Sequence, residues 1–409
     1  TLSASGTAYT LGRSDTIGSL AGVADSSVTL ANGVTLSAGG TGASTTLASL
    51  VSGNGNLVKQ GSGTWTLSGA NSYGGTTTVQ GGTLQLGADE AIPDASLLTV
   101  GNSAEFFLNG HTETVHRVAG SGRIHLASTL MIGGDNSSYT LTPEIYGTGN
   151  LVKQGSGTIT VTQSIDLGSS GNVRIAGGTL AVGAGGNIGD LGTSSVQVDS
   201  GALLDIQRSN GFTMANRGIT GNGAMRIVSG GNLVLNAPVD LTLGSSAATN
   251  DARLSVQAVG VLTLGASLSV AGSNPNADTG AIDLRAARII VGNGVGLNTI
   301  GGRWLVWTNS PLTDIGEETL SYDFRQYAAT AGSTSPTGSG NGLMYLVSPD
   351  VGSIGLTALV TKTYDGSVIS PVLNSDLSGV SFDLAQTSLI NGDTPVGLRV
   401  SNNSTATYD

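Results

Sequence analysis

The chain has 409 residues, of which 65 are glycine, 11% are charged and 4% are aromatic, and it contains no cysteine. Such a glycine content disfavours an α-rich enzyme, and the lack of cysteine excludes disulfides, thiolate metal sites and a cysteine nucleophile. The formal net charge of −11, without a basic stripe, predicts that nucleic acid is not a partner.

The sequence shows no membrane-spanning or targeting segment. It has no run of 18 apolar residues, which predicts that no helix of this chain crosses a bilayer. The first residues, Thr1 to Ala4, include neither Met nor a basic segment, so no signal peptide is expected. We therefore expect the chain to be a processed or excised form of its precursor.

Taken in chain order, the first clear feature is an internal repeat. Residues 53–64 return as residues 147–158 with eleven of twelve residues identical, at an offset of 94. Residues 79–87 correspond to residues 175–183 at an offset of 96, and a looser echo occupies residues 219–235. Long-range repetition is typical of solenoids, in which each coil stacks on the preceding one.

Apolar residues alternate with small polar ones throughout most of the chain. This period-two pattern predicts half-buried strands bounded by glycine-rich turns. The clearest segments are 65–67, 84–86, 233–235, 241–243, 254–256, 262–264 and 268–270.

Repeat and alternation together predict an all-β fold, a right-handed parallel β-helix (β-solenoid) over residues 1–305, followed by a small β-module. With roughly 20 to 25 residues per coil, this gives about a dozen coils and a rod about 60 Å long. Leu84 should point inward, so that Leu84→Asp would bury a charge and disrupt neighbouring coils.

Residues 53–87 resemble a known repeat. Their Lys59 to Thr64, Gly69 to Thr76 and Gly81 to Leu84 motifs are similar to the passenger-associated transport repeat of autotransporters. Residues 107–122 also resemble the pattern between such repeats, whereas the second copy lacks the Asn-Ser-Tyr-Gly-Gly stretch after Thr158. The resemblance implies a bacterial exoprotein that is exported by an outer-membrane secretion partner or a fused barrel.

A second resemblance lies further along the chain. Gly302 to Trp307, with Tyr322 to Phe324 and Tyr327, is similar to the segment that ends haemagglutination-type β-helices, and Lys362 to Gly366 resembles the opening of YDG or mucin-binding-glycan-related (MBG) domains of filamentous-haemagglutinin-like adhesins. We therefore expect a β-helix at residues 1–305, a helix-terminating segment and linker at 306–360, and the start of a YDG/MBG-like β domain, truncated here, at 361–409.

Two clusters of polar residues are candidate chemical sites. His111, His116 and His125 lie near Glu113 in the sequence, as metal ligands could, but their spacing matches neither a helical pair nor a zinc pattern. Exposed strand faces or turns explain them more simply.

The second cluster is acidic. Asp89, Glu90 and Asp94 could supply the paired carboxylates of glycoside hydrolysis. They flank Ala91 to Pro93, however, where a turn or short helical excursion between coils accounts for them better.

Five aromatic residues are candidate sugar-stacking groups. Such a role requires exposure, whereas aromatic residues in a solenoid are more simply explained by burial. The residues concerned are Trp65, Tyr73, Trp304, Trp307 and Tyr327. The sequence therefore predicts no catalytic, cofactor-binding or metal residue, no cofactor, and no identifiable ligand-binding residue.

These observations predict a secreted, non-catalytic adhesin or biofilm-matrix stalk at the bacterial cell surface. Its expected partners are the secretion barrel and host or matrix glycans or proteins. A self-assembling extracellular filament subunit remains an alternative, since a solenoid end offers a strand edge to another chain. A glycan-active β-helix enzyme is a further alternative, which the sparse and scattered charges disfavour.

Overall fold

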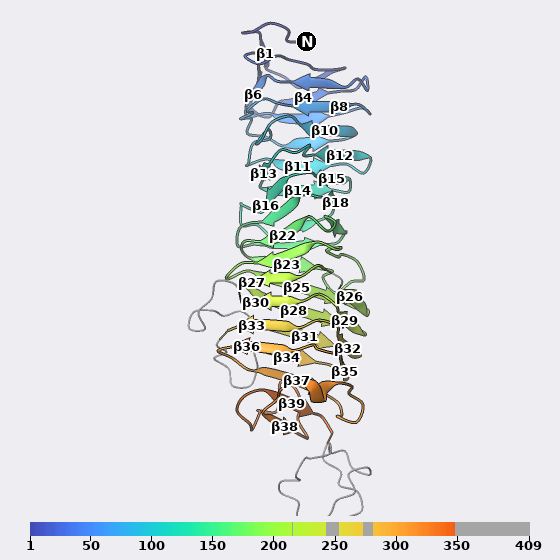
Figure 1. Cartoon of the computed structure of the whole chain (residues 1–409). Coiled ribbons are helices and arrows are strands. Elements are labelled where there is room, and N and C mark those ends of the chain that lie inside the picture. The colour runs from blue at the N-terminus through green and yellow to red at the C-terminus, as the bar shows by residue number, and fades with distance from the viewer. Residues whose placement is uncertain (215, 243–252, 273–280, 348–409) are drawn as a thin grey trace, which may run out of the picture.

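The computed structural model describes residues 1–214, 216–242, 253–272 and 281–347. In this part the chain forms a parallel β-solenoid, as the sequence predicts. Short strands stack from the N-terminal end of the rod to its C-terminal end (Figure 1). The single helical element of the described residues is a 3-10 turn, η1 (Glu317–Thr319). The predicted module at residues 361–409 lies outside the described residues.

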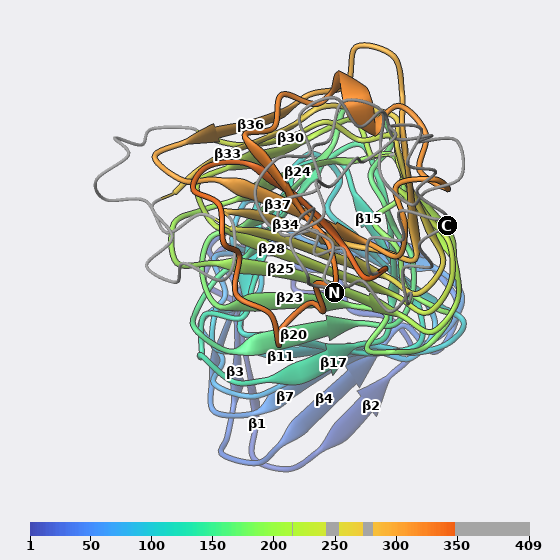
Figure 2. The ribbon, with the colours of Figure 1, turned by 90° about the horizontal axis from the view of Figure 1, so that it is seen from below.

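Three faces run along the rod and enclose the core (Figure 2). The first face begins with a three-stranded sheet and continues, after two turns without strands, in a nine-stranded sheet. Its strands, in chain order, are β1 (Ala8–Leu11), β3 (Ser27–Leu30), β6 (Leu50–Gly53), β13 (Glu113–Val115), β16 (Thr129–Ile132), β19 (Asn150–Lys153), β22 (Asn172–Ile175), β24 (Ser195–Val198), β27 (Ile219–Gly221), β30 (Val239–Leu241), β33 (Leu268–Ala271) and β36 (Leu297–Ile300).

The second face is the longest. A six-stranded sheet is followed by a ten-stranded sheet, and the Arg117 guanidinium lies over the Tyr139 ring where the two meet. Its strands are β2 (Asp15–Ile17), β4 (Thr35–Ala38), β7 (Asn56–Lys59), β9 (Thr77–Val79), β11 (Leu97–Val100), β14 (Arg117–Gly120), β17 (Tyr139–Leu141), β20 (Thr158–Val161), β23 (Thr179–Val182), β25 (Leu203–Arg208), β28 (Ala224–Ser229), β31 (Leu254–Ala258), β34 (Ile282–Arg285), β37 (Trp304–Thr308), β39 (Gly342–Tyr345) and, at the end, β38 (Phe324–Gln326).

The third face consists of a seven-stranded and a four-stranded sheet with a break between them. The first sheet contains β5 (Thr45–Leu47), β8 (Thr64–Leu67), β10 (Gly82–Leu86), β12 (Ala104–Phe107), β15 (Arg123–Leu126), β18 (Glu144–Gly147) and β21 (Ile165–Asp166); the second contains β26 (Phe212–Met214), β29 (Leu233–Leu235), β32 (Val261–Leu264) and β35 (Arg288–Val291).

The described solenoid is somewhat longer than the sequence predicts. The second face carries fifteen successive strands before β38, not about a dozen, because many turns use about 20 residues and the ladder continues beyond residue 305. There β37 spans residue 305, and β39 pairs with it in parallel. At about 4.8 Å per turn, the stack is about 70 Å long.

The core consists of columns of aliphatic side chains from successive turns. Leu84 is a representative member, with 0% of its surface exposed, and it pairs with Trp65 in the preceding turn and Phe106 in the following one. Its neighbours Thr83 and Gln85 point away from the core, which explains the period-two pattern.

Polar side chains replace the ladder where the first face lacks strands. Between β6 and β13, Val51 N–H donates to Asn71 Oδ1 over 2.8 Å, and Asn71 Nδ2 donates to the Ala91 carbonyl over 2.7 Å. In the next turn, Ile92 N–H donates to Glu113 Oε2 over 3.1 Å. These contacts satisfy backbone groups that would otherwise be buried without partners.

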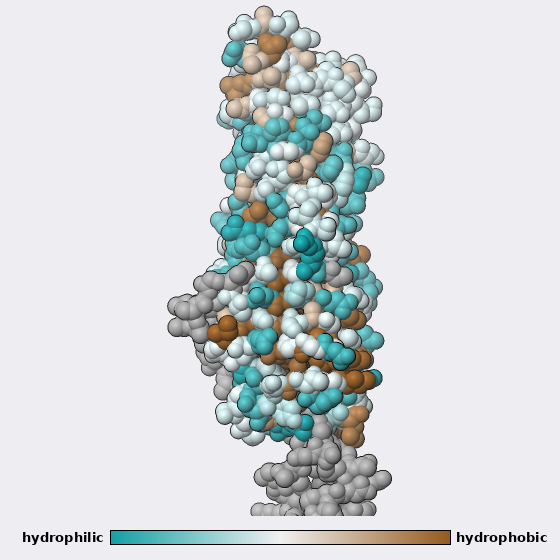
Figure 3. Space-filling view, in the orientation of Figure 1, coloured by the Kyte–Doolittle hydropathy of each residue, from teal (hydrophilic) through white to brown (hydrophobic). Residues whose placement is uncertain are grey.

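The surface is mostly polar or weakly polar, with an apolar area toward the C-terminal half on the side of β29, β32 and β35 (Figure 3). Large exposed apolar side chains among the described residues of this half are Val259, Ile300, Leu312, Ile315 and Leu346.

Candidate functional site

The two sequence repeats lie on different faces of the solenoid. The first copy places Asn56–Lys59 on the second face as β7, whereas the second places Asn150–Lys153 on the first face as β19. The 94-residue offset therefore covers four turns and two further faces. The repeated unit is a strand with the corner that follows it. The same unit is used on two different faces of the solenoid.

Each repeat contains a buried lysine that binds backbone carbonyls. Lys59, 1% exposed, donates from Nζ to the carbonyls of Gln60, Gly61 and Gly81 over 2.6, 2.9 and 2.9 Å. All three ammonium hydrogens can thereby be satisfied without a carboxylate. Burial lowers the pKa of this lysine.

The second copy reproduces this arrangement at another corner. Lys153, 0% exposed, donates from Nζ to the carbonyls of Gly155, Gly157 and Gly177 over 2.8, 2.5 and 2.7 Å. Burial again lowers its pKa. The sequence showed that these lysines recur, but their role became visible only from the structure.

The three histidines weighed as metal ligands do not converge on one point, in line with the simpler interpretation. His111 Nδ1 lies 3.1 Å from Asp89 Oδ1, and the backbone N–H of His116 donates to the Asp94 carbonyl. Glu113 points into the interior, with 0% exposure, where burial raises its pKa to about 9. No group of three or more metal-ligating side chains occurs in the described part of the chain.

The third histidine belongs to an aromatic stack on the outer surface of the third face. His125 lies between Phe107 and Tyr146, with ring centroids 4.5 and 4.7 Å apart. The Arg123 guanidinium covers the Tyr146 ring at 4.1 Å, and the Tyr146 hydroxyl donates to Glu105. Sequence analysis missed this stack because its members come from successive turns.

The acidic cluster supports the ladder. Asp89 Oδ1 accepts the Thr112 N–H over 3.0 Å, and Glu90 Oε2 accepts the Thr114 N–H over 3.0 Å. The segment beside them is a turn and includes no helix. These contacts agree with the turn interpretation.

The aromatic residues considered for sugar stacking are mainly buried, as the simpler interpretation predicts. Trp65, Tyr73, Trp304 and Trp307 are each at most 4% exposed. Tyr327 is partly buried and packs against Tyr345, with ring centroids 5.2 Å apart.

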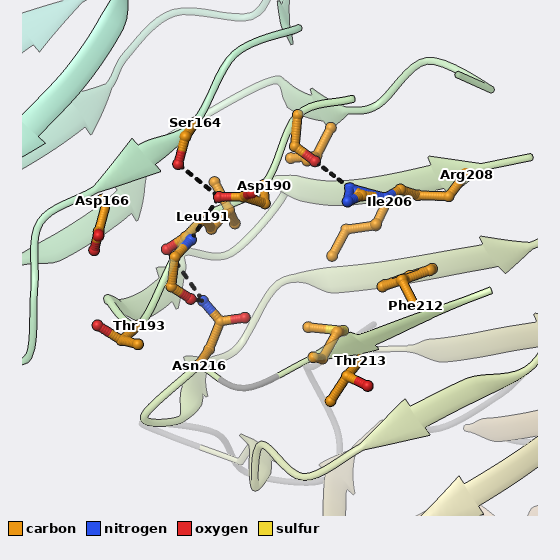
Figure 4. Close-up of a pocket in the computed structure, with 14 residues that line it drawn as sticks. Ser164, Asp166, Asp190, Leu191, Thr193, Ile206, Arg208, Phe212, Thr213 and Asn216 are labelled. Atoms are coloured by element: carbon orange, nitrogen blue, oxygen red, sulfur yellow. Dashed lines mark hydrogen bonds between the residues drawn. The ribbon is translucent and has the colours of Figure 1, made fainter. Parts of the chain in front are cut away.

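The candidate binding site lies at the break in the third face, between β21 and β26. In the turn between these two strands, residues 183–194 occupy the third face and contain no strand. Only an isolated bridge joins Ser164 to Asp190. Five of the ten residues 183–192 are glycine. The interruption leaves a hollow of about 490 Å³, which we call the ladder-break hollow (Figure 4).

Part of its wall is the apolar interior of the solenoid. Val182, Leu191, Ile206 and Met214 line the hollow, and each is at most 5% exposed. Thr213 also lines it and is exposed. Because its neighbours Phe212 and Met214 bond to the following turn, the backbone of Thr213 faces the hollow.

Two exposed carboxylates stand at the rim. Asp190 Oδ1 accepts the Ser164 hydroxyl over 2.7 Å and the Gly192 N–H over 3.1 Å, and Asp166 Oδ1 accepts the Gly168 N–H over 3.1 Å. Within the described residues, no hydrogen bond engages the Oδ2 atom of either carboxylate. These two oxygens are available to accept hydrogen bonds from a ligand.

The opposite wall carries the positive charge of Arg208, and its polar side chains donate hydrogen bonds to carbonyls of the solenoid itself. Arg208 donates from Nη1 to the Gly189 carbonyl over 2.6 Å, and its guanidinium lies 5.2 Å from the Phe212 ring centroid. Asn216 Nδ2 donates to the carbonyls of Leu191, Gly192 and Ser194 over 3.2 to 3.4 Å, which ties the glycine-rich segment to the next turn.

Sequence analysis did not identify any residue of the ladder-break hollow. The glycine run at 183–192 is a signal that could have indicated an interrupted strand. Of the helical structure in the described residues, none has the length and apolar character needed to cross a bilayer.

Comparison with known proteins relates the chain to autotransporter passengers. The passenger-associated-transport-repeat family matches residues 57–86 and 151–182, the two segments that carry the buried lysines. The adhesin BmaC autotransporter of Brucella suis biovar 1 (strain 1330) is 36% identical over 191 residues, which cover 42% of this chain. The alignment spans 6% of that relative's length. No solved structure matched the chain.

Proposed function

We propose that this chain is part of the exported passenger of an autotransporter-like protein and acts as a non-catalytic adhesive rod on the bacterial cell surface. The observation that carries the proposal is the pair of passenger-associated transport repeats built into a parallel β-solenoid. The identity to a segment of an autotransporter adhesin supports it.

The contacts inside the rod fit a passive scaffold. The acidic residues first considered for catalysis accept backbone hydrogen bonds of neighbouring turns, and the repeated lysines bind corner carbonyls. These groups serve the stack of turns, and the stack holds outward-facing side chains at a distance from the cell.

The proposal includes the partners and the downstream region. An outer-membrane barrel, fused or separate, would export the chain, and host or matrix glycans or proteins would be bound. Residues from 361 onward would begin a YDG/MBG-like module after a terminating segment at 306–360, as the Lys362 to Gly366 motif suggests. A role in biofilm matrix belongs to the same proposal.

Surface display tests this function. The chain would be fused to an autotransporter barrel and displayed on a non-adherent bacterium, with the barrel alone as control. We expect protease-accessible surface exposure and increased attachment to epithelial cells or matrix-coated surfaces. Equal display with attachment no greater than that of the barrel alone would contradict the proposal.

A further inference from the structure

We propose that the ladder-break hollow binds a sugar unit without an acidic group, such as a neutral hexose or an N-acetylated hexosamine within a glycan. This inference rests on the proposed adhesive function and assigns a ligand class to it. The hollow is the place where the third-face ladder is interrupted, and interior side chains form part of its wall (Figure 4).

The size of the hollow fits a small ligand. Its volume of about 490 Å³ lies within the range of ligand sites, roughly 300 to 1,000 Å³. That space is far larger than a bare cation needs. The described residues also provide no group of three metal-ligating side chains around it.

The polar groups of the rim match a polyhydroxylated ligand. Oδ2 of Asp166 and Oδ2 of Asp190 are available acceptors, and the hydroxyls of Thr193 and Thr213 can both donate and accept. Sugar hydroxyls are donors that can satisfy the carboxylates through charge-assisted hydrogen bonds.

The apolar wall supplies the complementary surface. Ile206 and Met214 contribute aliphatic and thioether groups to this wall, and Phe212 adds an aromatic ring near which the Arg208 guanidinium lies. The C–H faces of a sugar ring can pack against such groups while its hydroxyls reach the rim.

Charge selects against acidic sugars. The two rim carboxylates would repel uronate, sialate or sulfate groups, and the chain as a whole carries a net charge of −11. Arg208 is the one cationic side chain of the lining, so its charge offsets only one of the two carboxylates and the lining keeps a net charge of −1.

The test uses the purified full chain on an array of neutral, N-acetylated, amine-bearing and acidic glycans and of lysine-rich peptides. The best neutral glycan is then titrated by saturation-transfer NMR. Asp190→Asn should weaken binding about tenfold or more by removing the charged acceptor. Thr213→Trp should abolish it by placing an indole at the mouth of the hollow, and a circular-dichroism melt would verify that each variant folds.

Asp240→Asn is the matched control, since it removes an exposed carboxylate from the first face, outside the hollow. It should bind like the parent. The proposal is overturned by preferential binding of acidic glycans or lysine-rich peptides, by no glycan binding, or by binding that survives Thr213→Trp in a folded protein.

Display of the same variants separates this inference from the proposed function. If bacteria displaying the parent chain and the Thr213→Trp variant attach equally well, the sugar site is refuted while adhesion stands. If neither attaches, the adhesive function fails, and the array result on the purified chain still decides whether the hollow binds sugar.

Discussion

The buried lysines show how one side chain can complete a corner of the solenoid. At a corner, carbonyls turn away from the strand ladders, and burial without donors would cost free energy. Lys59 and Lys153 each supply an ammonium group that donates to three such carbonyls. Of the three lysines in the chain, these two are the ones inside the repeats.

Replacing Lys59 by methionine keeps the length of the side chain but removes its donors. Because the carbonyls of Gln60, Gly61 and Gly81 would lose this partner, we expect Lys59→Met to lower the free energy of unfolding by about 1 to 3 kcal/mol. Denaturant unfolding followed by circular dichroism measures the change. Arg13→Met, at an exposed position, is the control, and equal stability of both variants would contradict the assigned role.

Glu113 provides a pH-dependent test. Its pKa is raised to about 9 by burial, so the folded state holds a proton that the unfolded state releases near pH 4.5. The stability supplied by the protonated carboxyl is present in full below about pH 4.5 and is lost as the pH rises toward 9.

We therefore expect Glu113→Gln, which stays neutral and can still accept the Ile92 N–H, to reduce the fall in melting temperature between pH 5 and pH 9. The exposed Glu144→Gln variant is the control. A parent and Glu113→Gln protein with the same pH profile would show that the carboxyl is ionised in the fold.

At the scale of elements, the corner is the unit that the sequence repeats. Gly61 has φ +66°, and a Cβ atom there would lie 2.1 Å from the Gly39 carbonyl oxygen of the preceding turn. The equivalent Gly155 would place its Cβ 2.2 Å from the Gly133 carbonyl oxygen. The repeated glycines are thus required by close approach between turns.

A matched pair of substitutions separates this close approach from backbone strain. Gly33 has φ +72°, but a Cβ atom added there would meet no other atom within 4 Å. We expect Gly61→Ala to lower the unfolding free energy by at least about 1 kcal/mol more than Gly33→Ala, because only the former adds a steric clash. Thermal or denaturant melts of the two variants measure this difference. Equal losses would mean that the corner relaxes freely.

The strands were predictable because the alternation of apolar and polar residues within each strand reflects which side chains are buried. Alternation at Leu84 to Leu86 follows directly from one inward and one outward side of β10. The aromatic stack was not predictable, because Phe107, His125 and Tyr146 meet only when the register of three turns is known. The ladder-break hollow was not predicted because its lining also comes from several turns, so that the glycine run at 183–192 could indicate an interrupted strand but not the residues around it.

For the whole molecule, the structure predicts an elongated particle. The described turns form a stack about 70 Å long, and the remaining residues add to its mass. We expect small-angle X-ray scattering of the full chain to give a pair-distance distribution with an early maximum, set by the rod's cross-section, and an extended tail. A symmetric distribution, typical of a sphere, would contradict the solenoid.

The placement of the two repeats on different faces has a consequence for how such proteins change length. Each added or lost strand-and-corner unit rotates all later residues about the long axis by one third of a revolution. Only the gain or loss of three units, or a multiple of three, leaves their direction unchanged. The direction in which a distal feature such as the ladder-break hollow faces, around the long axis, is therefore set by the number of units before it. Insertions along the rod can rotate that feature toward or away from an opposing cell or matrix surface without altering a single residue within it.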